Sequence, residues 1–145
     1  MFKHLLVPTD GSEESETAIR KSIELAKSIR ATVTGFHVLP TFHVFTYRTE
    51  MLEDTRELFE KDSRIHAAKF LASIERAAQE AGVPCNTVSV MSDQPYEAII
   101  KTAAEQGCDL IAMASHGRKG VKGFLLGSET QKVLVHTQIP VMVFR

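Results

Sequence analysis

Short apolar runs alternate along this chain with stretches of helix-spaced apolar residues, and that alternation limits the fold more than any other feature. The runs are strand-sized and lie at residues 4–7, 32–39, 86–91, 110–114 and 141–144. Between them, apolar residues recur every three or four positions, as on one face of a helix. Strict alternation is typical of a parallel sheet with helices on both faces and right-handed crossovers. We therefore expect a three-layer α/β/α sandwich with a five-stranded parallel sheet.

The helices of this sandwich have predictable ends and inner faces. They are expected at residues 12–30, 51–81, 95–107 and 128–136. Ser12 is placed to cap the first helix, and Ser128 with Gln131 would form a capping box for the last. The first helix would bury Ala18, Ile19, Ile23, Ala26 and Ile29. The long second helix would bury Leu58, Ile65, Ala68, Leu71, Ile74, Ala78 and Ala81.

The last three strands differ in how fully they should be covered. Residues 110–114 are apolar throughout, which predicts burial on both faces inside the sheet, whereas residues 86–91 alternate as at an edge. The final strand is apolar on both faces, yet a strand added last normally lies at an edge, where unpaired backbone invites pairing. A two-fold partner would cover it. The sequence thus predicts a homodimer formed through Val141, Met142, Val143 and Phe144.

Length and composition narrow the classes of function. Residues 1–145 correspond to one domain, with no second lobe for a separate substrate. The 17 Lys and Arg against 18 Asp and Glu lack the basic excess of a nucleic-acid binder. No run reaches the ~18 apolar residues of a membrane span, and the start has no signal-peptide pattern. We expect a cytoplasmic protein that binds neither nucleic acid nor membrane, with Cys85 and Cys108 as core residues.

A glycine-rich segment between the fourth strand and the last helix is the strongest functional signal. Residues 114–128 read Ala-Ser-His-Gly-Arg-Lys-Gly-Val-Lys-Gly-Phe-Leu-Leu-Gly-Ser. Glycines let the backbone approach a ligand, and a helix N-terminus after Gly127 offers unpaired donors to an anion. The spacing is neither a P-loop nor a dinucleotide fingerprint. From composition alone, a structural glycine loop explains the segment as well as an anion site does.

This segment, the opening Val-Pro-Thr-Asp-Gly-Ser and the closing Ile-Pro-Val-Met-Val-Phe together resemble the universal stress protein family over the whole chain. ATP-binding members carry G-x2-G-x9-G-[ST]. Gly117, nine intervening residues and Gly127-Ser128 match it, but Ala114 stands at the first glycine. The resemblance implies a Rossmann-like sheet in strand order 3-2-1-4-5, ATP binding, stress-response regulation and dimerisation through the last strand.

The resemblance also implies where a nucleotide would lie. Asp10 would accept hydrogen bonds from the ribose, although a turn or cap residue is an equally good interpretation. The base and sugar would contact Pro8, Thr9, Val38, Met113 and Ala114. The phosphates would lie among Gly117, Arg118, Gly127, Ser128, Glu129 and Thr130, with Mg²⁺ held through phosphate oxygens. Arg118, Lys119 and Lys122 could neutralise phosphate, or form an ordinary solvated loop.

No motif for catalysis or for a metal site is found. The six histidines form no matched metal pair, and neither G-x-S-x-G nor H-E-x-x-H occurs. Trp is absent and only two Tyr are present, which argues against a flavin. The leading hypothesis is a homodimeric switch that binds ATP. Slow ATP hydrolysis and a dimeric interaction module without nucleotide remain alternatives.

Overall fold

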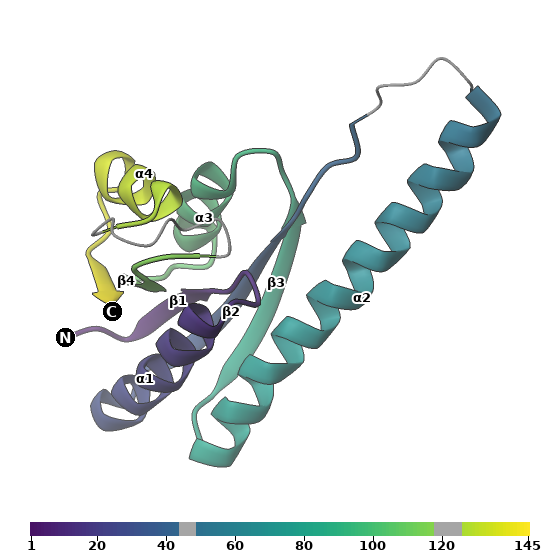
Figure 1. Ribbon diagram of the computed structural model, residues 1–145. Coiled ribbons are helices and arrows are strands. Elements are labelled where there is room, and N and C mark those ends of the chain that lie inside the picture. Colours follow the sequence, from purple (N-terminus) through teal and green to yellow (C-terminus); the bar gives the residue numbers. More distant parts are fainter. Residues whose placement is uncertain (44–48, 118–125) are drawn as a thin grey trace.

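A computed structural model describes residues 1–43, 49–117 and 126–145, and it confirms the alternation (Figure 1). The strands are β1 (His4–Pro8), β2 (Thr32–Leu39), β3 (Cys85–Met91), β4 (Leu110–Ala114) and β5 (Val141–Phe144). The helices are α1 (Glu13–Ile29), α2 (Thr49–Ala81), α3 (Pro95–Glu105) and α4 (Ser128–His136). None of these helices combines the length and the apolar character needed to cross a membrane.

The strands form one parallel sheet in the order β3-β2-β1-β4-β5, as predicted. β3 and β5 lie at the edges, and β4 lies inside with all five residues buried. β1 lies between β2 and β4, so the strand order reverses beside it: β2 and β3 are added on one side, and β4 and β5 are added on the other. Parallel strands all end at the same edge of a sheet, so the segments after β1, β2 and β4 must meet there.

Helices cover both faces of the sheet (Figure 1). Leu5, Val7 and Ala112 face α1 and α2, and pack with Ile19, Ile23 and Ile74. Leu6, Ile111 and Met113 face α3 and α4, and pack with Ile99, Ala103 and Val133. This strand alternation fixes which side chain lies on which face near the carboxyl end of β4.

Two expectations for helix faces were wrong. Ile29 is exposed, because it is the last residue of α1 and lies past the packed turns. Along α2, Leu71, Ile74 and Ala78 are buried as expected, but Ala68 is exposed, and Leu58 and Ile65 are 68% and 57% exposed. The N-terminal half of α2 projects past the sheet (Figure 1), so its helical spacing has no core behind it.

Candidate functional site

A cavity of about 610 Å³ opens at the carboxyl edge of the sheet, where β1, β2 and β4 end beside the start of α4. Its volume is within the ~300–1,000 Å³ of small-molecule sites. It lies at the point where the strand order reverses, the usual ligand position in such sheets. Its lining includes Pro8, Thr9, Asp10, Val38, Met113, Ala114, Gly117, Gly127, Ser128, Glu129 and Thr130. The candidate Arg118, with Lys119 and Lys122, lies outside the described residues.

The turn after β1 holds Asp10 by local hydrogen bonds. The Thr9 amide donates to the Phe36 carbonyl at 2.8 Å, which ties the turn to β2. The Asp10 Oδ1 atom accepts from the Ser12 amide at 2.9 Å, and Ser12 caps α1 by accepting from the Ser15 amide at 3.1 Å, as predicted. The turn and the cap therefore fix the carboxylate at the cavity.

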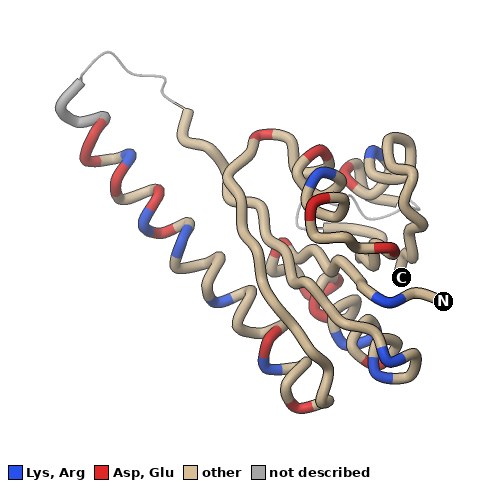
Figure 2. The backbone as a smooth tube through the Cα atoms, turned by 180° about the vertical axis from the view of Figure 1, so that it is seen from behind, with Lys and Arg blue, Asp and Glu red and all other residues tan. Residues whose placement is uncertain are grey.

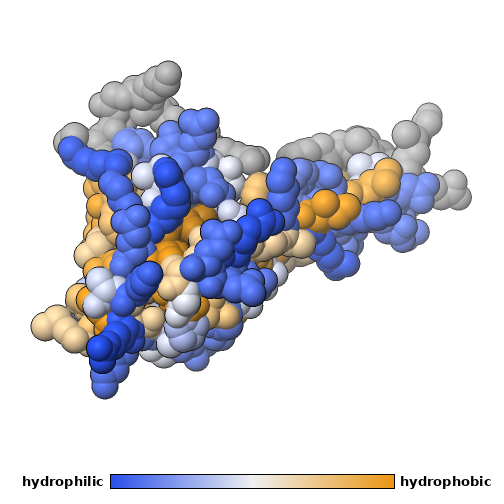
Figure 3. Space-filling view, turned by 90° about the horizontal axis from the view of Figure 1, so that it is seen from below, coloured by the Kyte–Doolittle hydropathy of each residue, from blue (hydrophilic) through white to orange (hydrophobic). Residues whose placement is uncertain are grey.

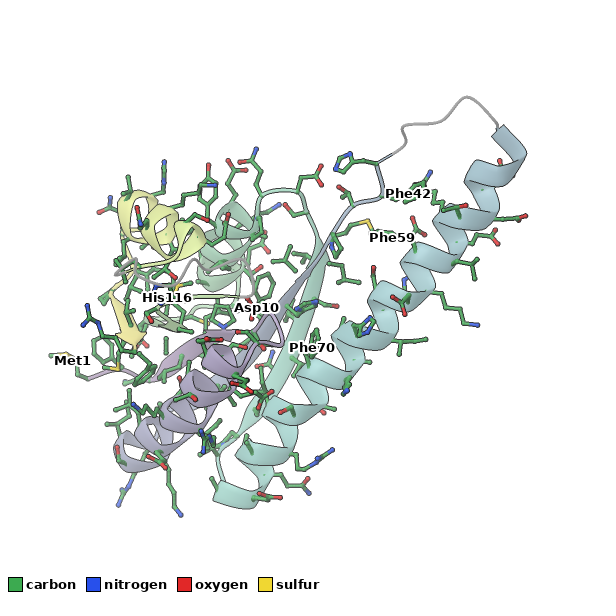
Figure 4. All side chains as sticks on the ribbon, viewed as in Figure 1. Met1, Asp10, Phe42, Phe59, Phe70 and His116 are labelled. Carbon is green, nitrogen blue, oxygen red and sulfur yellow. The ribbon has the colours of Figure 1, made fainter. Side chains whose placement is uncertain are left out.

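Gly11 in this turn is required for two reasons. Its φ of +79° lies in the left-handed region that side chains disfavour. A Cβ atom built on it would also overlap the ring of Phe70 from α2. The turn that carries Asp10 therefore packs directly on α2 (Figure 4).

The Asp10 carboxylate also lies against the backbone of Gly117, in the segment after β4. A Cβ atom built on Gly117 would overlap Asp10 Oδ2. Glycine therefore lets two segments more than 100 residues apart in sequence meet at one point of the cavity. The glycine-rich segment led us to expect a close approach of the backbone to a ligand, and the approach that the structure describes at Gly117 is to Asp10.

Hydrogen bonds join the end of β4 to the start of α4. The Ser115 carbonyl accepts from the Gly127 amide at 2.6 Å, and the Ala114 carbonyl accepts from the Thr130 hydroxyl at 3.0 Å. These contacts aim the first turn of α4 at the cavity. The first amides of a helix have no acceptor within the helix, so they present donors and a positive dipole to an anion.

The predicted capping box at Ser128 was wrong. Gly127 is the N-cap, with φ −67° and ψ 158°, and Ser128 is the first helical residue. The Gln131 side chain donates to the Leu126 carbonyl at 3.0 Å instead of reaching back to Ser128. The helix therefore does not use the exposed Ser128 hydroxyl as its cap.

Ala114 causes no backbone strain at the first motif position. Among the described non-glycine residues only Arg30 has a positive φ, so Ala114 has ordinary strand geometry. Strand alternation directs its methyl group to the face of Leu110 and Ala112, which is covered by α1. The backbone conformation here does not require glycine.

Glu129 and Thr130 use their side chains for structure. The Glu129 carboxylate accepts from the Tyr96 amide at 3.0 Å, in the first turn of α3, and from Lys132 at 3.3 Å. α3 has no side-chain bond from its own cap residue, so Glu129 supplies this function from α4. Since the Thr130 hydroxyl is bonded to Ala114, only the backbone amides of these two residues could serve an anion.

Sequence reasoning missed the far wall of the cavity. The missed lining residues are Ser15, Phe36, His37, Pro40, Thr41, His43, Ser92, Asp93, Pro95 and Ile99. Buried His37 donates from Nδ1 to the Thr9 carbonyl at 2.8 Å. Its ring contacts the Phe70 ring edge-on, with the two ring centroids 5.2 Å apart. His43 Nε2 and Asp93 Oδ1 lie 2.9 Å apart, joining the segments after β2 and β3. The one feature of the sequence that could have predicted these lining residues is the end of β3, which lies at this same edge of the sheet.

The electrostatics of the described lining are unusual for an anion site. Asp10, Asp93 and Glu129 contribute carboxylates, and the described lining residues include no Lys or Arg. Among the described residues, stabilisation of an anion therefore falls to the backbone donors at the start of α4. No cluster of three or more potential metal ligands occurs among the described residues.

The two cysteines lie outside this lining. Burial raises the pKa of the Cys108 thiol to about 11 and also raises that of Cys85. Both thiols are therefore protonated at neutral pH, whereas the reactive form of a cysteine is the thiolate.

Comparison with known proteins places the chain in a family. The model of the Universal stress protein family matches residues 1–145. Universal stress protein YxiE of Bacillus subtilis is 30% identical over 149 residues and is covered completely, as is this chain. The structure of MJ0577 from Methanocaldococcus jannaschii has a TM-score of 0.79 at 28% identity, covering 99% of this chain and 95% of its own.

A third relative was solved with a nucleotide. It is the universal stress protein from Archaeoglobus fulgidus in complex with dAMP, with a TM-score of 0.70, covering 100% of this chain and 98% of its own. At 17% identity this likeness shows a common fold. The fold, the family model and the full-length relatives agree: this chain belongs to the universal stress protein family.

Proposed function

We propose that this protein binds an adenine nucleotide in the cavity at the carboxyl edge of the sheet, with ATP as the expected ligand. One observation carries the proposal. All candidate residues that the structure describes, drawn from the segments after β1, β2 and β4 and from α4, line a single cavity of about 610 Å³. A dAMP complex of a protein with the same fold supports the choice of an adenine nucleotide.

The proposed orientation follows from the chemistry of the lining. The phosphates lie between Gly117 and the first turn of α4, where backbone donors and the helix dipole stabilise negative charge. The ribose lies at Asp10, whose carboxylate accepts from sugar hydroxyls. The base extends along the end of β2 past Val38. Mg²⁺ would bind through phosphate oxygens, so the fit of a metal depends on the nucleotide.

The test is calorimetric titration with ATP, AMP and GTP, together with mass spectrometry of ligand released from freshly purified protein. Asp10→Asn keeps the Oδ1 acceptor for the Ser12 amide but removes the negative charge. A hydrogen bond to a charged group is worth about 1.5–3 kcal/mol, so the affinity for ATP should fall about tenfold or more. Asp109→Asn is the matched control at the opposite edge of the sheet and should leave affinity unchanged.

Two results would overturn the proposal. One is that neither released nor titrated adenine nucleotide binds the wild-type protein. The other is that Asp10→Asn and Asp109→Asn bind ATP equally well. Release of phosphate from ATP and Mg²⁺ in the same samples would show whether binding is accompanied by hydrolysis.

We also propose that the protein acts as a homodimeric regulatory switch in a stress response, with β5 as the dimer strand. All four β5 residues, Val141 to Phe144, are half-buried at the edge of the sheet, and a matching strand would cover them. Val143→Asp should abolish pairing through β5 and so lower the mass of the assembly in light scattering. An assembly mass that Val143→Asp leaves unchanged, in protein that remains folded by circular dichroism, would contradict β5 pairing.

A further inference from the structure

The N-terminal half of α2 is a helix without a core. From residue 53 to residue 66 no side chain is buried, and this part projects beyond the sheet (Figures 1 and 3). The ring of Phe59 packs on Phe42 at 5.4 Å, on the side of the body. Helices in proteins owe most of their stability to packing of an amphipathic face, so a segment this long calls for a covering surface.

The exposed apolar residues of this segment lie on the side turned away from the body. At 3.6 residues per turn, Leu58 and Ile65 are two turns apart on one stripe, opposite the face that buries Leu71, Ile74 and Ala78. The same stripe carries four exposed charged residues. Together these form the outer stripe of α2, made of Asp54, Leu58, Lys61, Asp62, Ile65 and Lys69.

The charges on the outer stripe are self-complementary. In chain order the stripe reads acid, apolar, base, acid, apolar, base, so reversing its direction exchanges each charge for its opposite. Figure 2 shows acidic and basic residues interspersed along this part of α2. Asp62 also contacts His66 at 3.4 Å, yet its side chain is 72% exposed.

A second copy running antiparallel matches this pattern. With a two-fold axis between positions 61 and 62, Leu58 lies opposite Ile65 of the second copy. Asp54 then lies opposite Lys69, and Lys61 lies opposite Asp62. A two-fold axis repeats each of these contacts, so the interface is isologous and closed.

We propose that the outer stripe of α2 is a self-association surface, on which α2 of a second copy packs antiparallel. The apolar pairs supply the attraction, and the charged pairs set the direction and register. This surface is remote from β5 (Figure 1), so it adds to β5 pairing and does not replace it. Two different two-fold interfaces on one chain build a tetramer or a longer assembly.

The test is a charge swap at the two-fold axis, followed by sedimentation velocity over a range of concentrations. Lys61→Glu places like charges at both Lys61–Asp62 contacts and should weaken the association about tenfold. The double variant Lys61→Glu/Asp62→Lys restores opposite charges across the axis and should restore wild-type association. Arg64→Glu makes the same charge change off the stripe and should shift it less than about twofold.

The experiment is repeated in a Val143→Asp background, so that loss of β5 pairing and loss of α2 pairing are separated. There a dimer should remain, and Lys61→Glu should weaken it by the same factor of about ten. Equal sedimentation of wild type and Lys61→Glu would overturn the proposal. So would failure of the double variant to recover, since this would point to a partner of another kind or to another register. Neither outcome depends on nucleotide binding.

Discussion

The two edges of the sheet hold similar polar residues but arrange them differently. At the amino edge, His4 Nε2 and the Thr34 hydroxyl are 2.6 Å apart, and Thr34 donates to Asn86 at 2.7 Å. Asn86 in turn donates to Gln106 at 3.3 Å. These side chains satisfy one another across β1, β2, β3 and the end of α3.

At the carboxyl edge the polar groups hold the backbone around a cavity instead. The Thr9 hydroxyl bonds Ser15 and accepts from the Gly11 amide, and Thr130 bonds the end of β4. Glycines at 117 and 127 keep side chains out of the space between them. The comparison teaches that hydrogen-bonded polar residues alone do not identify a ligand site. A ligand site is indicated by polar groups that support an open cavity and the N-terminus of a helix.

The strongest test of this difference between the two edges is to fill the space at Gly117. Gly117→Ala places a methyl group where Asp10 Oδ2 lies, so the flexible carboxylate must move. We expect nucleotide affinity to fall about thirtyfold, equivalent to about 2 kcal/mol, because a charge-assisted hydrogen bond is lost. The free energy of unfolding should change little. Calorimetric titration and urea unfolding measure the two quantities.

Gly127→Ala is the matched variant for that experiment. Its φ of −67° suits alanine, and the added Cβ would lie 3.3 Å from the His116 Cα and the Ser115 carbonyl oxygen. The neighbouring backbone has to yield slightly, so a smaller loss of affinity is expected. An equal loss for both variants would contradict a special role for the contact between Asp10 and Gly117.

At the amino edge the largest expected effect is on stability. Thr34→Val removes a fully buried hydroxyl that serves both His4 and Asn86. Because His4 is half-buried and Asn86 is exposed, water can satisfy both partners, so the expected cost is that of the two lost hydrogen bonds, about 1–2 kcal/mol, measured by urea unfolding. Nucleotide affinity should stay at the wild-type value. A change in affinity without a change in stability would mean that the two edges are not separate in function.

Much of the fold and of the site could be predicted from local patterns. The alternation of strand and helix periods gave the architecture, and the all-apolar run at 110–114 gave an interior strand. The turn at Asp10 and the segment at Gly117 were recognisable because the turns and glycine loops that follow strands depend on residue types that are adjacent in the sequence.

What could not be predicted depends on packing between distant elements. The periodicity of α2 does not reveal that its N-terminal half projects past the sheet (Figure 1), nor that Leu58 and Ile65 lie opposite the face that buries Leu71, so this exposed half looked like core. The bond from Glu129 to the first turn of α3 and the contact of His43 with Asp93 join residues far apart in sequence. The cap of α4 moved by one residue because Gly127 is held by Ser115, a contact that no helix rule includes.

Buried threonines provide a closer comparison of the two edges. Thr130→Val deletes the bond to the Ala114 carbonyl, as Thr34→Val deletes the bond to Asn86, with the same change of shape. We expect Thr130→Val to lower the free energy of unfolding by about 1 kcal/mol. Because this bond aims the first turn of α4, affinity should also fall a few-fold. Calorimetry on both valine variants checks this, and loss of affinity in neither would indicate that the Gly127 bond alone positions α4.

The smallest expected effect concerns pH at the amino edge. Partial burial alone would raise the pKa of Asp109, but hydrogen bonds from the His4 and Lys3 amides, at 3.0 and 2.9 Å, outweigh it and hold the pKa below its usual value. A depressed folded-state pKa stabilises the fold above the unfolded-state pKa of about 3.9, and that contribution is lost as the pH falls through the folded-state value. Asp109→Asn does not titrate, so its stability deficit should be constant near neutral pH and shrink below about pH 4. Urea unfolding of both proteins from neutral to acid pH measures the deficit, and one that grows toward acid would mean that the two amides do not favour the ionised carboxylate.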